Sequence, residues 1–171
     1  PQFLAAQHAV AAALAMQQAI QPVARVQVSA ATSVQLTIKT AIASGAVRRF
    51  VVGDPAIQRI DVLAGSTLDR MAAAEHLARV GELLVDPATV AILGDRISIS
   101  EQRQDPEGLG CFAVVNALFD SPAVTQLPTT LPVLREELVR PWVIPMLYTR
   151  LQDQSSFLAE LRPATSLFVR F

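Results

Sequence analysis

The chain has 171 residues, of which 51% are apolar and 17% are charged, and its formal net charge at pH 7 is −1. This composition predicts a globular protein with a real hydrophobic core and excludes an intrinsically disordered chain. Because the charges nearly cancel, there is no electrostatic case for nucleic acid or for an anionic membrane surface as a partner. The length allows one domain plus an extension.

Two further features bear on where the protein works. Cys111 is the only cysteine, so no disulfide framework exists and a reducing, cytoplasmic location is expected. The longest apolar run near the start, residues 9–16, is about half of a membrane span and lacks a basic flank. It predicts neither a signal peptide nor a transmembrane helix. The first residue is Pro1 rather than Met, which favours a piece of a longer protein.

The N-terminal part predicts one long helix. Residues 2–21 are rich in good helix formers, and Pro22 ends them. One apolar face has helical spacing and consists of Phe3, Ala6, Val10, Ala13, Leu14 and Gln17. His8 lies among alanines and is expected to be structural or solvated. Residues 23–33 have the composition of a connecting loop.

The following stretch predicts three strands. Residues 34–43 alternate with a period of two, which places Leu36, Ile38 and Ile42 on one buried face. Residues 47–52 and 57–63 are two further strands, separated by a Gly-Asp-Pro turn at residues 53–55, and we expect an antiparallel hairpin.

A helix, a strand and a capped second helix come next. Ser66 or Thr67 is expected to cap a helix that runs to about Arg79. The apolar face predicted for this helix is Leu68, Met71, Ala72, the stem of Glu75, Leu77 and Ala78. Residues 82–85 form a short strand, and Asp86 with Pro87 starts a short helix. Strands are expected again at residues 96–101 and 111–118.

Beyond Asp120 the composition changes. Prolines punctuate a segment with helical patches at residues 133–140 and 146–152, which favours a structured connector over a loose linker. Residues 164–171 are a β-rich run.

Five stretches in this order resemble the catalytic domain of class III nucleotidyl cyclases, and more narrowly the tandem-domain branch of the soluble adenylyl cyclase type. They are residues 11–20, 36–45, 50–54 (Phe-Val-Val-Gly-Asp), 65–74 (the signature loop and helix) and 81–85. Residues 160–169 resemble the start of the second cyclase domain in that branch.

The resemblance implies an α/β (α+β) fold, namely a ferredoxin-like class III cyclase catalytic domain that is truncated at its N-terminus and carries a helical C-terminal extension. Residues 1–119 would be a partial cyclase domain, residues 120–162 an interdomain connector, and residues 163–171 the first strand of a second cyclase domain. Since an open sheet edge tends to be covered, we expect residues 165–171 to fill the place of the missing first strand, from the same chain or from a neighbour.

The resemblance also implies the activity of the parent protein. Members of this family convert ATP to cyclic AMP and pyrophosphate in a cleft between two paired cyclase domains. Two Mg²⁺ or Mn²⁺ ions, held by aspartate carboxylates, assist the reaction. The implied partners are the second cyclase domain of the same chain or a homodimer mate, with ATP as the substrate of the parent.

The residues at the family's functional positions depart from its pattern. Asp69 stands at the signature Asn position, Ala73 at the Arg position, and Val62 where a polar residue would read the base. With Asp54 of the 50–54 turn, these are the expected nucleotide-cleft remnants. The metal carboxylates would lie before Pro1, and Arg170 stands where the second domain would carry its own. We therefore expect no catalytic residue and no metal ligand in this chain, and no cyclase activity from it alone.

Simpler roles are favoured for several of these residues. Asp54 fits a hairpin turn, Asp69 fits a helix N-terminus, and Arg70 and Lys39 fit solvated positions. Cys111 is expected to pack as a small apolar residue. The carboxylates of Asp61, Glu75 and Asp86 do not predict an acid–base dyad.

Three hypotheses remain open at the level of function. The chain is part of a tandem adenylyl cyclase, or a degenerate cyclase-like module for regulation or dimerisation, or an unrelated α/β sensor or assembly domain.

Overall fold

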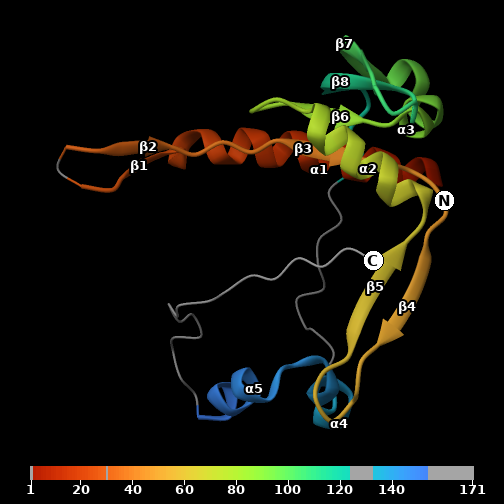
Figure 1. Cartoon of the computed structure of the whole chain (residues 1–171). Helices are drawn as coiled ribbons and strands as arrows, with labels where there is room; N and C mark the ends of the chain where they lie inside the picture. Colours follow the sequence, from red (N-terminus) through yellow and green to blue (C-terminus); the bar gives the residue numbers. More distant parts are fainter. Residues whose placement is uncertain (1, 30, 124–132, 154–171) are drawn as a thin grey trace. The chain divides into compact units, whose positions relative to one another are not determined.

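The computed structural model describes residues 2–29, 31–123 and 133–153, which form two compact units (Figure 1). The first unit comprises Pro1–Arg49 and Leu63–Leu127, and the second comprises Phe50–Val62 and Pro128–Phe171. Residues 163–171, with the second-domain strand expected there, lie outside the described residues.

The centre of the first unit is a four-stranded sheet. Its order is β3 (Thr40–Ile42), β6 (Leu83–Val85), β8 (Cys111–Leu118) and β7 (Ile97–Gln104). β3 and β6 are parallel and are connected through α2 (Ser66–Leu77), whereas β6 with β8 and β8 with β7 are antiparallel. The mixed α/β architecture expected from the sequence is therefore present.

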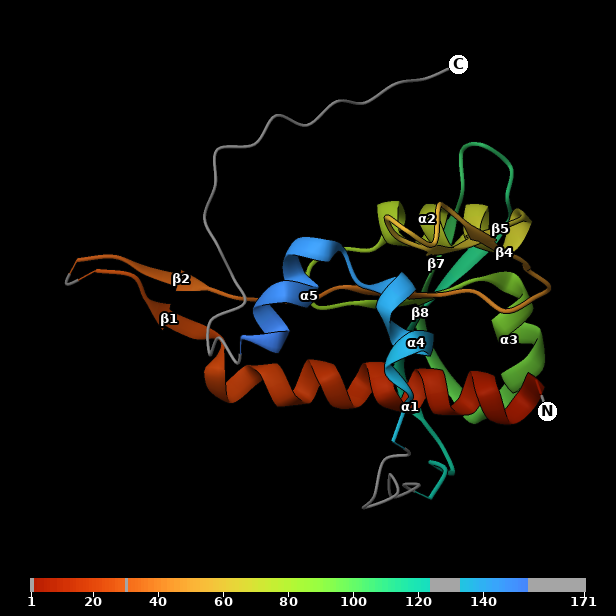
Figure 2. The same ribbon diagram turned by 90° about the horizontal axis from the view of Figure 1, so that it is seen from below.

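Helices cover both faces of this sheet. Because side chains alternate along a strand, Leu83 and Val85 of β6 face one layer and Leu84 faces the other. The first layer holds α1 (Gln2–Ile20) and α3 (Pro87–Leu93), and the second holds α2. Figures 1 and 2 show α1 and α2 on opposite sides of the sheet.

The predicted face of α1 is confirmed. Ala6, Val10 and Ala13 are buried against the sheet, and Phe3 and Leu14 pack beside them. With the 3₁₀ turn η1 (Gln21–Val23), this segment is long and apolar enough to cross a membrane by length and composition, which residues 9–16 alone did not suggest. One such helix is weak evidence of a membrane span, because the core helix of a soluble protein and an N-terminal signal sequence pass the same test, and 22% of this window is buried.

Residues 34–43 do not form the single strand that the sequence predicts. β1 (Arg25–Gln27) and β2 (Ser33–Gln35) form an antiparallel hairpin where a loop was expected. The Leu36 amide donates to the Ala24 carbonyl at 2.7 Å and so extends this hairpin, while β3 begins only at Thr40. Alternation alone did not reveal the break, because residues 36–39 keep the period-two pattern without pairing as one strand.

The predicted hairpin of β4 (Arg48–Val52) and β5 (Ile60–Ala64) is confirmed, and Figure 1 shows the two strands running in opposite directions. Most of this hairpin, Phe50–Val62, belongs to the second unit, together with α4 (Glu136–Val139), η3 (Arg140–Trp142) and α5 (Pro145–Gln152). The amide of Arg59 donates to the Pro141 carbonyl at 2.5 Å, which ties the hairpin to η3. The helical patches expected in the connector are present.

The remaining elements also follow the sequence closely. Asp86 caps α3 with Pro87 in its first position, as predicted, and η2 (Gly94–Arg96) leads into β7. The predicted apolar face of α2 is confirmed at Leu77 and Ala78 but wrong at Met71, which is 44% exposed. The residues buried within the helix are Thr67, Ala73 and Ala74. The helix turns its small residues to the sheet, where Phe112 fills the space.

Candidate nucleotide-cleft remnant

A hollow of about 550 Å³ lies between α2 and the loop that joins β7 to β8. We call it the α2 hollow, and its lining residues are Asp69, Ala72, Ala73, His76, Leu77, Asp105, Pro106, Glu107 and Leu109. Two of the four expected cleft remnants, Asp69 and Ala73, therefore line the same hollow. They do so because positions four apart share one side of a helix.

The other two remnants are not part of this lining. Asp54 lies at the tip of the β4–β5 hairpin, where its carboxylate accepts a hydrogen bond from the Ala56 amide at 2.8 Å. Its carbonyl also accepts from the Ile57 and Gln58 amides, so the residue holds a turn. Val62 is on β5 and is 37% exposed.

The α2 hollow has acidic rather than phosphate-binding chemistry. Asp69, Asp105 and Glu107 contribute carboxylates, and none of the lining residues is Lys or Arg. The Asp105 carboxylate is already used, because it accepts from the amides of Glu107 and Leu109 at 3.1 and 3.0 Å. A polyphosphate would meet repulsion here instead of the cationic groups it needs.

Ala73 also has a packing role that explains a small residue at this position. It is 9% exposed and belongs to the core cluster with Leu84 and Phe112. A guanidinium at position 73 would have to leave this cluster to reach the hollow. Within the described residues no group of three or more His, Cys, Asp or Glu side chains is arranged to hold a metal ion.

The start of α2 is built differently from the sequence-based expectation. Gly65 occupies the N-cap position with φ of 127°, and neither Ser66 nor Thr67 caps the helix with its side chain. The Thr67 hydroxyl instead donates to the Ala46 carbonyl at 2.8 Å. The loop before β4 is thereby fixed to α2.

A buried ion pair beside this loop was missed from the sequence. Arg70, expected to be solvated, donates from Nε to Asp86 Oδ2 at 2.7 Å and from Nη2 to the Ser44 carbonyl at 2.9 Å. Asp86 is fully buried, and its other oxygen accepts from the Ser44 amide and from the amide and hydroxyl of Thr89. This Arg70–Asp86 node joins the end of β3, α2 and the start of α3.

The charge of Asp86 is stabilised by these donors. Burial by itself would raise the pKa of Asp86, but the hydrogen bonds from Thr89, Arg70 and Ser44 outweigh it and hold the pKa below its ordinary value. Asp86 therefore works as an ionised structural group, and it is not available as an acid or a base.

Gly45 fits tightly against this node. A Cβ atom on Gly45 would lie 2.5 Å from Thr67 Oγ1 and 2.9 Å from Arg70 Nη2. Gly45→Ala is therefore expected to lower the free energy of unfolding by about 1–3 kcal/mol, because both side chains must give up their positions. Urea unfolding measures the change.

The matched control for this prediction uses Thr67→Ala. It removes the hydroxyl 2.5 Å from the new methyl group and leaves only the approach to Arg70 Nη2, so Gly45→Ala is expected to cost less in that background than in the native chain. Equal costs in both backgrounds would contradict the steric explanation.

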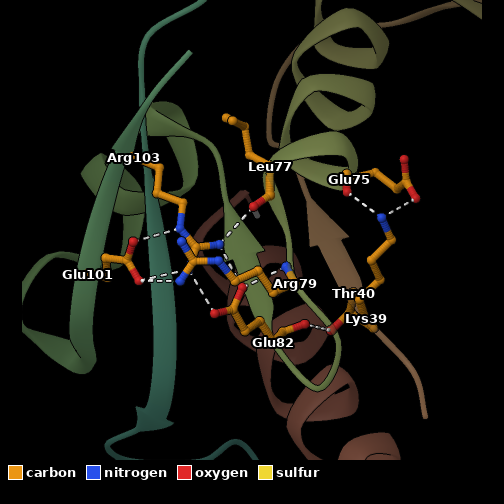
Figure 3. A network of polar contacts seen from close by, with 8 residues as sticks. All are labelled: Lys39, Thr40, Glu75, Leu77, Arg79, Glu82, Glu101 and Arg103. Atoms are coloured by element: carbon orange, nitrogen blue, oxygen red, sulfur yellow. Dashed lines mark hydrogen bonds and ion pairs between the residues drawn. The ribbon is translucent and has the colours of Figure 1, made fainter. Parts of the chain in front are cut away.

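A second ion-pair network lies at the other end of α2 (Figure 3). Arg103 of β7 binds both carboxylate oxygens of Glu82 at 2.6 and 2.7 Å and both of Glu101 at 2.7 and 2.8 Å. It also donates to the carbonyl of Leu77 at 2.7 Å, at the helix C-terminus where a cation is favoured. The hydrogen bond from Arg103 lowers the pKa of Glu82 to about 2, against the effect of its burial.

The structure also tests the predictions made for Lys39, Cys111 and His8. Lys39 is not a free solvated side chain, because its Nζ lies 2.8 Å from both Glu75 Oε1 and the Glu75 carbonyl oxygen (Figure 3). Cys111 is exposed and not packed in the core, and His8 is exposed as expected.

Comparison with solved structures shows which known fold this chain resembles. The catalytic core of a rhodopsin-guanylyl cyclase with converted specificity, solved in complex with ATPαS, matches with a TM-score of 0.50 and 20% sequence identity. The fold is that of a class III nucleotidyl cyclase catalytic core. The match covers 66% of this chain and 59% of the cyclase core, so this chain spans less than two thirds of that structure.

A second solved structure is also similar. The guanylate cyclase domain of RhGC from Catenaria anguillulae, in complex with GTP, matches at 17% identity over 42% of this chain and 40% of that chain, with a TM-score of 0.36. No family model and no curated protein matches the sequence.

Proposed function

We propose that this chain is a non-catalytic cyclase-fold domain that acts within a nucleotidyl cyclase of the tandem, soluble adenylyl cyclase-like type. In this proposal the chain supplies scaffold and one wall of the cleft. Other parts of the parent supply the Mg²⁺- or Mn²⁺-binding carboxylates and the groups that hold ATP while cyclic AMP and pyrophosphate form. A cytoplasmic location, close to the ATP pool, is part of the proposal.

One observation carries the non-catalytic part of this proposal. On a fold that matches a cyclase core, α2, which resembles the family's signature helix, contributes Asp69 and Ala73 to an acidic hollow whose described lining residues include no Lys or Arg. An aspartate repels phosphate oxygens, and a methyl group donates no hydrogen bond to them. Neither residue can therefore stabilise the negative charge that develops on a cyclising triphosphate.

The direct test is turnover by the purified chain. With ATP or GTP and either Mg²⁺ or Mn²⁺, we expect no cyclic nucleotide above a no-protein control, measured by mass spectrometry of the products. The paired test uses a longer chain that includes the flanking sequence on both sides, and this chain is expected to make cyclic AMP. Cyclic nucleotide formed by the short chain would overturn the proposal.

The β4–β5 hairpin favours a second candidate, a degenerate cyclase-like module for dimerisation or regulation. Its large apolar side chains are 37–54% exposed, and they are Phe50, Val51, Val52, Ile60, Val62 and Leu63. Exposed apolar clusters of this kind mark interaction surfaces. If the longer chain is inactive but dimerises through this hairpin, the second candidate replaces the first.

A further inference from the structure

Carboxylates of the first unit differ in whether a cation neutralises them. Four of them contact a Lys or Arg side chain at 2.6–2.8 Å, namely Glu75, Glu82, Asp86 and Glu101. Figure 3 shows this pairing for Glu75, Glu82 and Glu101. The three carboxylates that line the α2 hollow, those of Asp69, Asp105 and Glu107, have no ion pair within the described part of the chain. Uncompensated negative charge is therefore concentrated at this hollow.

Asp105 is the least exposed of these three acids and still has an oxygen without a partner. Only 7% of the residue is exposed. The amides of Glu107 and Leu109 both donate to Oδ2, and Oδ1 has no hydrogen-bond partner among the described residues. No described side-chain oxygen is both fully buried and without a partner, so Oδ1 is still accessible to solvent in a residue that lines the hollow.

The anchored turn makes Asp105 a preorganised acceptor. Because two amides fix Oδ2, the plane of the carboxylate is held and Oδ1 needs no reordering to accept a hydrogen bond. A charged acceptor that is nine-tenths buried gains more from a cationic donor than an exposed one does. The chemistry missing at this position is a positively charged donor.

The rest of the lining favours an organic cation over a metal ion. Mg²⁺ and Ca²⁺ need a shell of six or more oxygens, and no described group of acidic side chains is arranged to hold a metal. Five of the nine lining residues are apolar instead, namely Ala72, Ala73, Leu77, Pro106 and Leu109. They match the methylene stem of a side chain whose charged end reaches the carboxylates.

The positive groups around the hollow leave this charge in place. His76 lines it, but the His76 side chain is 83% exposed and its Nε2 lies 3.8 Å from Glu75 Oε2. Arg103 donates to the carbonyl of the lining residue Leu77, and both Glu82 and Glu101 neutralise it. Neither group is paired with the acids of the hollow.

We propose that the α2 hollow binds an arginine side chain of a partner protein, carried on a segment with apolar residues beside the arginine. A guanidinium has five donors in one plane and can contact several separated carboxylates at once, which an ammonium does less well. The hollow, at about 550 Å³, falls within the range of about 300–1,000 Å³ that ligand sites have, and so it also has room for the neighbouring side chains. Arginine is among the residues that most often anchor an interface.

This proposal goes beyond the function proposed above and does not depend on it. Binding of an arginine needs only the acids and the apolar lining of the hollow. Cyclic nucleotide made by the short chain would overturn the proposed function and leave the arginine site standing, whereas failure of the titration below would do the opposite.

Titration of the ¹⁵N-labelled full chain tests the site. The probe is the acetylated and amidated pentapeptide Leu-Ala-Arg-Ala-Leu, and its control carries the neutral isostere citrulline in place of the arginine. The amide signals of Asp69, Ala73 and Glu107 are expected to shift with the arginine peptide, while that of Val10, on the other face of the sheet, stays in place. The citrulline peptide should bind at least about tenfold more weakly. Equal shifts with both peptides, or none at about 5 mM peptide, would refute the proposal.

Point variants locate the binding charge. Asp105→Asn keeps an oxygen for the turn and puts a donor in place of Oδ1, so it should raise the Kd of the arginine peptide about tenfold. Asp69→Asn and Glu107→Gln change exposed residues and should each raise it about two- to fivefold, which keeps the test decisive if Asp105→Asn does not fold. Asp95→Asn removes the same charge from an exposed residue outside the hollow and should leave the Kd unchanged. An equal effect of Asp95→Asn would show general attraction to an acidic surface and no arginine site.

Two further arms distinguish other occupants. Spermidine and Mg²⁺, each at the concentration of the peptide, are expected to shift the same signals much less. If either binds as well as the arginine peptide, the hollow takes cations without regard to the guanidinium and the assignment is wrong. Signals that are independent of chain concentration without peptide support a separate partner, whereas signals that change on dilution of the chain alone, together with a dimer, would replace it by a second copy.

Discussion

Asp86→Ala is expected to lower the free energy of unfolding by about 3–5 kcal/mol, the largest effect of any single substitution considered for this protein. The substitution leaves the Arg70 guanidinium without its carboxylate and removes the cap of α3. It also leaves the amides of Ser44 and Thr89 without their acceptor in a fully buried position. Urea unfolding followed by circular dichroism measures the change.

Two variants separate the causes of this effect. Asp86→Asn keeps an oxygen that can accept from Thr89 but removes the charge, so it is expected to cost less than the alanine variant. Asp69→Ala, which removes an exposed carboxylate from the same region, should change stability by less than about 1 kcal/mol. Equal effects of Asp86→Ala and Asp69→Ala would contradict the assigned role of the Arg70–Asp86 node.

Arg103→Met is expected to destabilise the protein by about 2–3 kcal/mol at neutral pH, because Glu82 and the Leu77 carbonyl lose their donor. The effect should depend on pH in a defined direction. The pKa of Glu82 is lowered from 4.5 to about 2 in the folded protein. A lowered carboxylate pKa contributes stability above pH 4.5, and that contribution is lost as the pH falls from 4.5 toward 2.

The difference between the native chain and Arg103→Met should therefore shrink over this acidic window. Equilibrium unfolding in urea at several pH values between 7 and 2 measures it. Glu101→Gln is the matched control, since Glu101 is 44% exposed and its contact with Arg103 is screened by solvent, so a much smaller loss is expected. A difference that stays constant down to pH 2 would show that Glu82 is not held by Arg103.

The cleft remnants show how far a sequence pattern can predict a site. Asp69 and Ala73 could be placed together because a helix fixes which positions share a side, and the structure puts both on the α2 hollow. Asp54 could be assigned to a turn because Gly53 and Pro55 flank it. Whether Asp54 and Val62 lie near a nucleotide depends on the position of the β4–β5 hairpin, and a local sequence pattern does not determine that position.

Local sequence signals determined most of the elements of this protein and its architecture. The apolar spacing of α1, the Asp86-Pro87 start of α3 and the apolar run of β8 follow from propensity, capping and burial, which act over a few residues. Only the tertiary structure decided the ion pairs of Arg70 with Asp86 and of Arg103 with Glu82. Their partners are 16 and 21 residues apart, and their alignment depends on how α2 packs across the sheet.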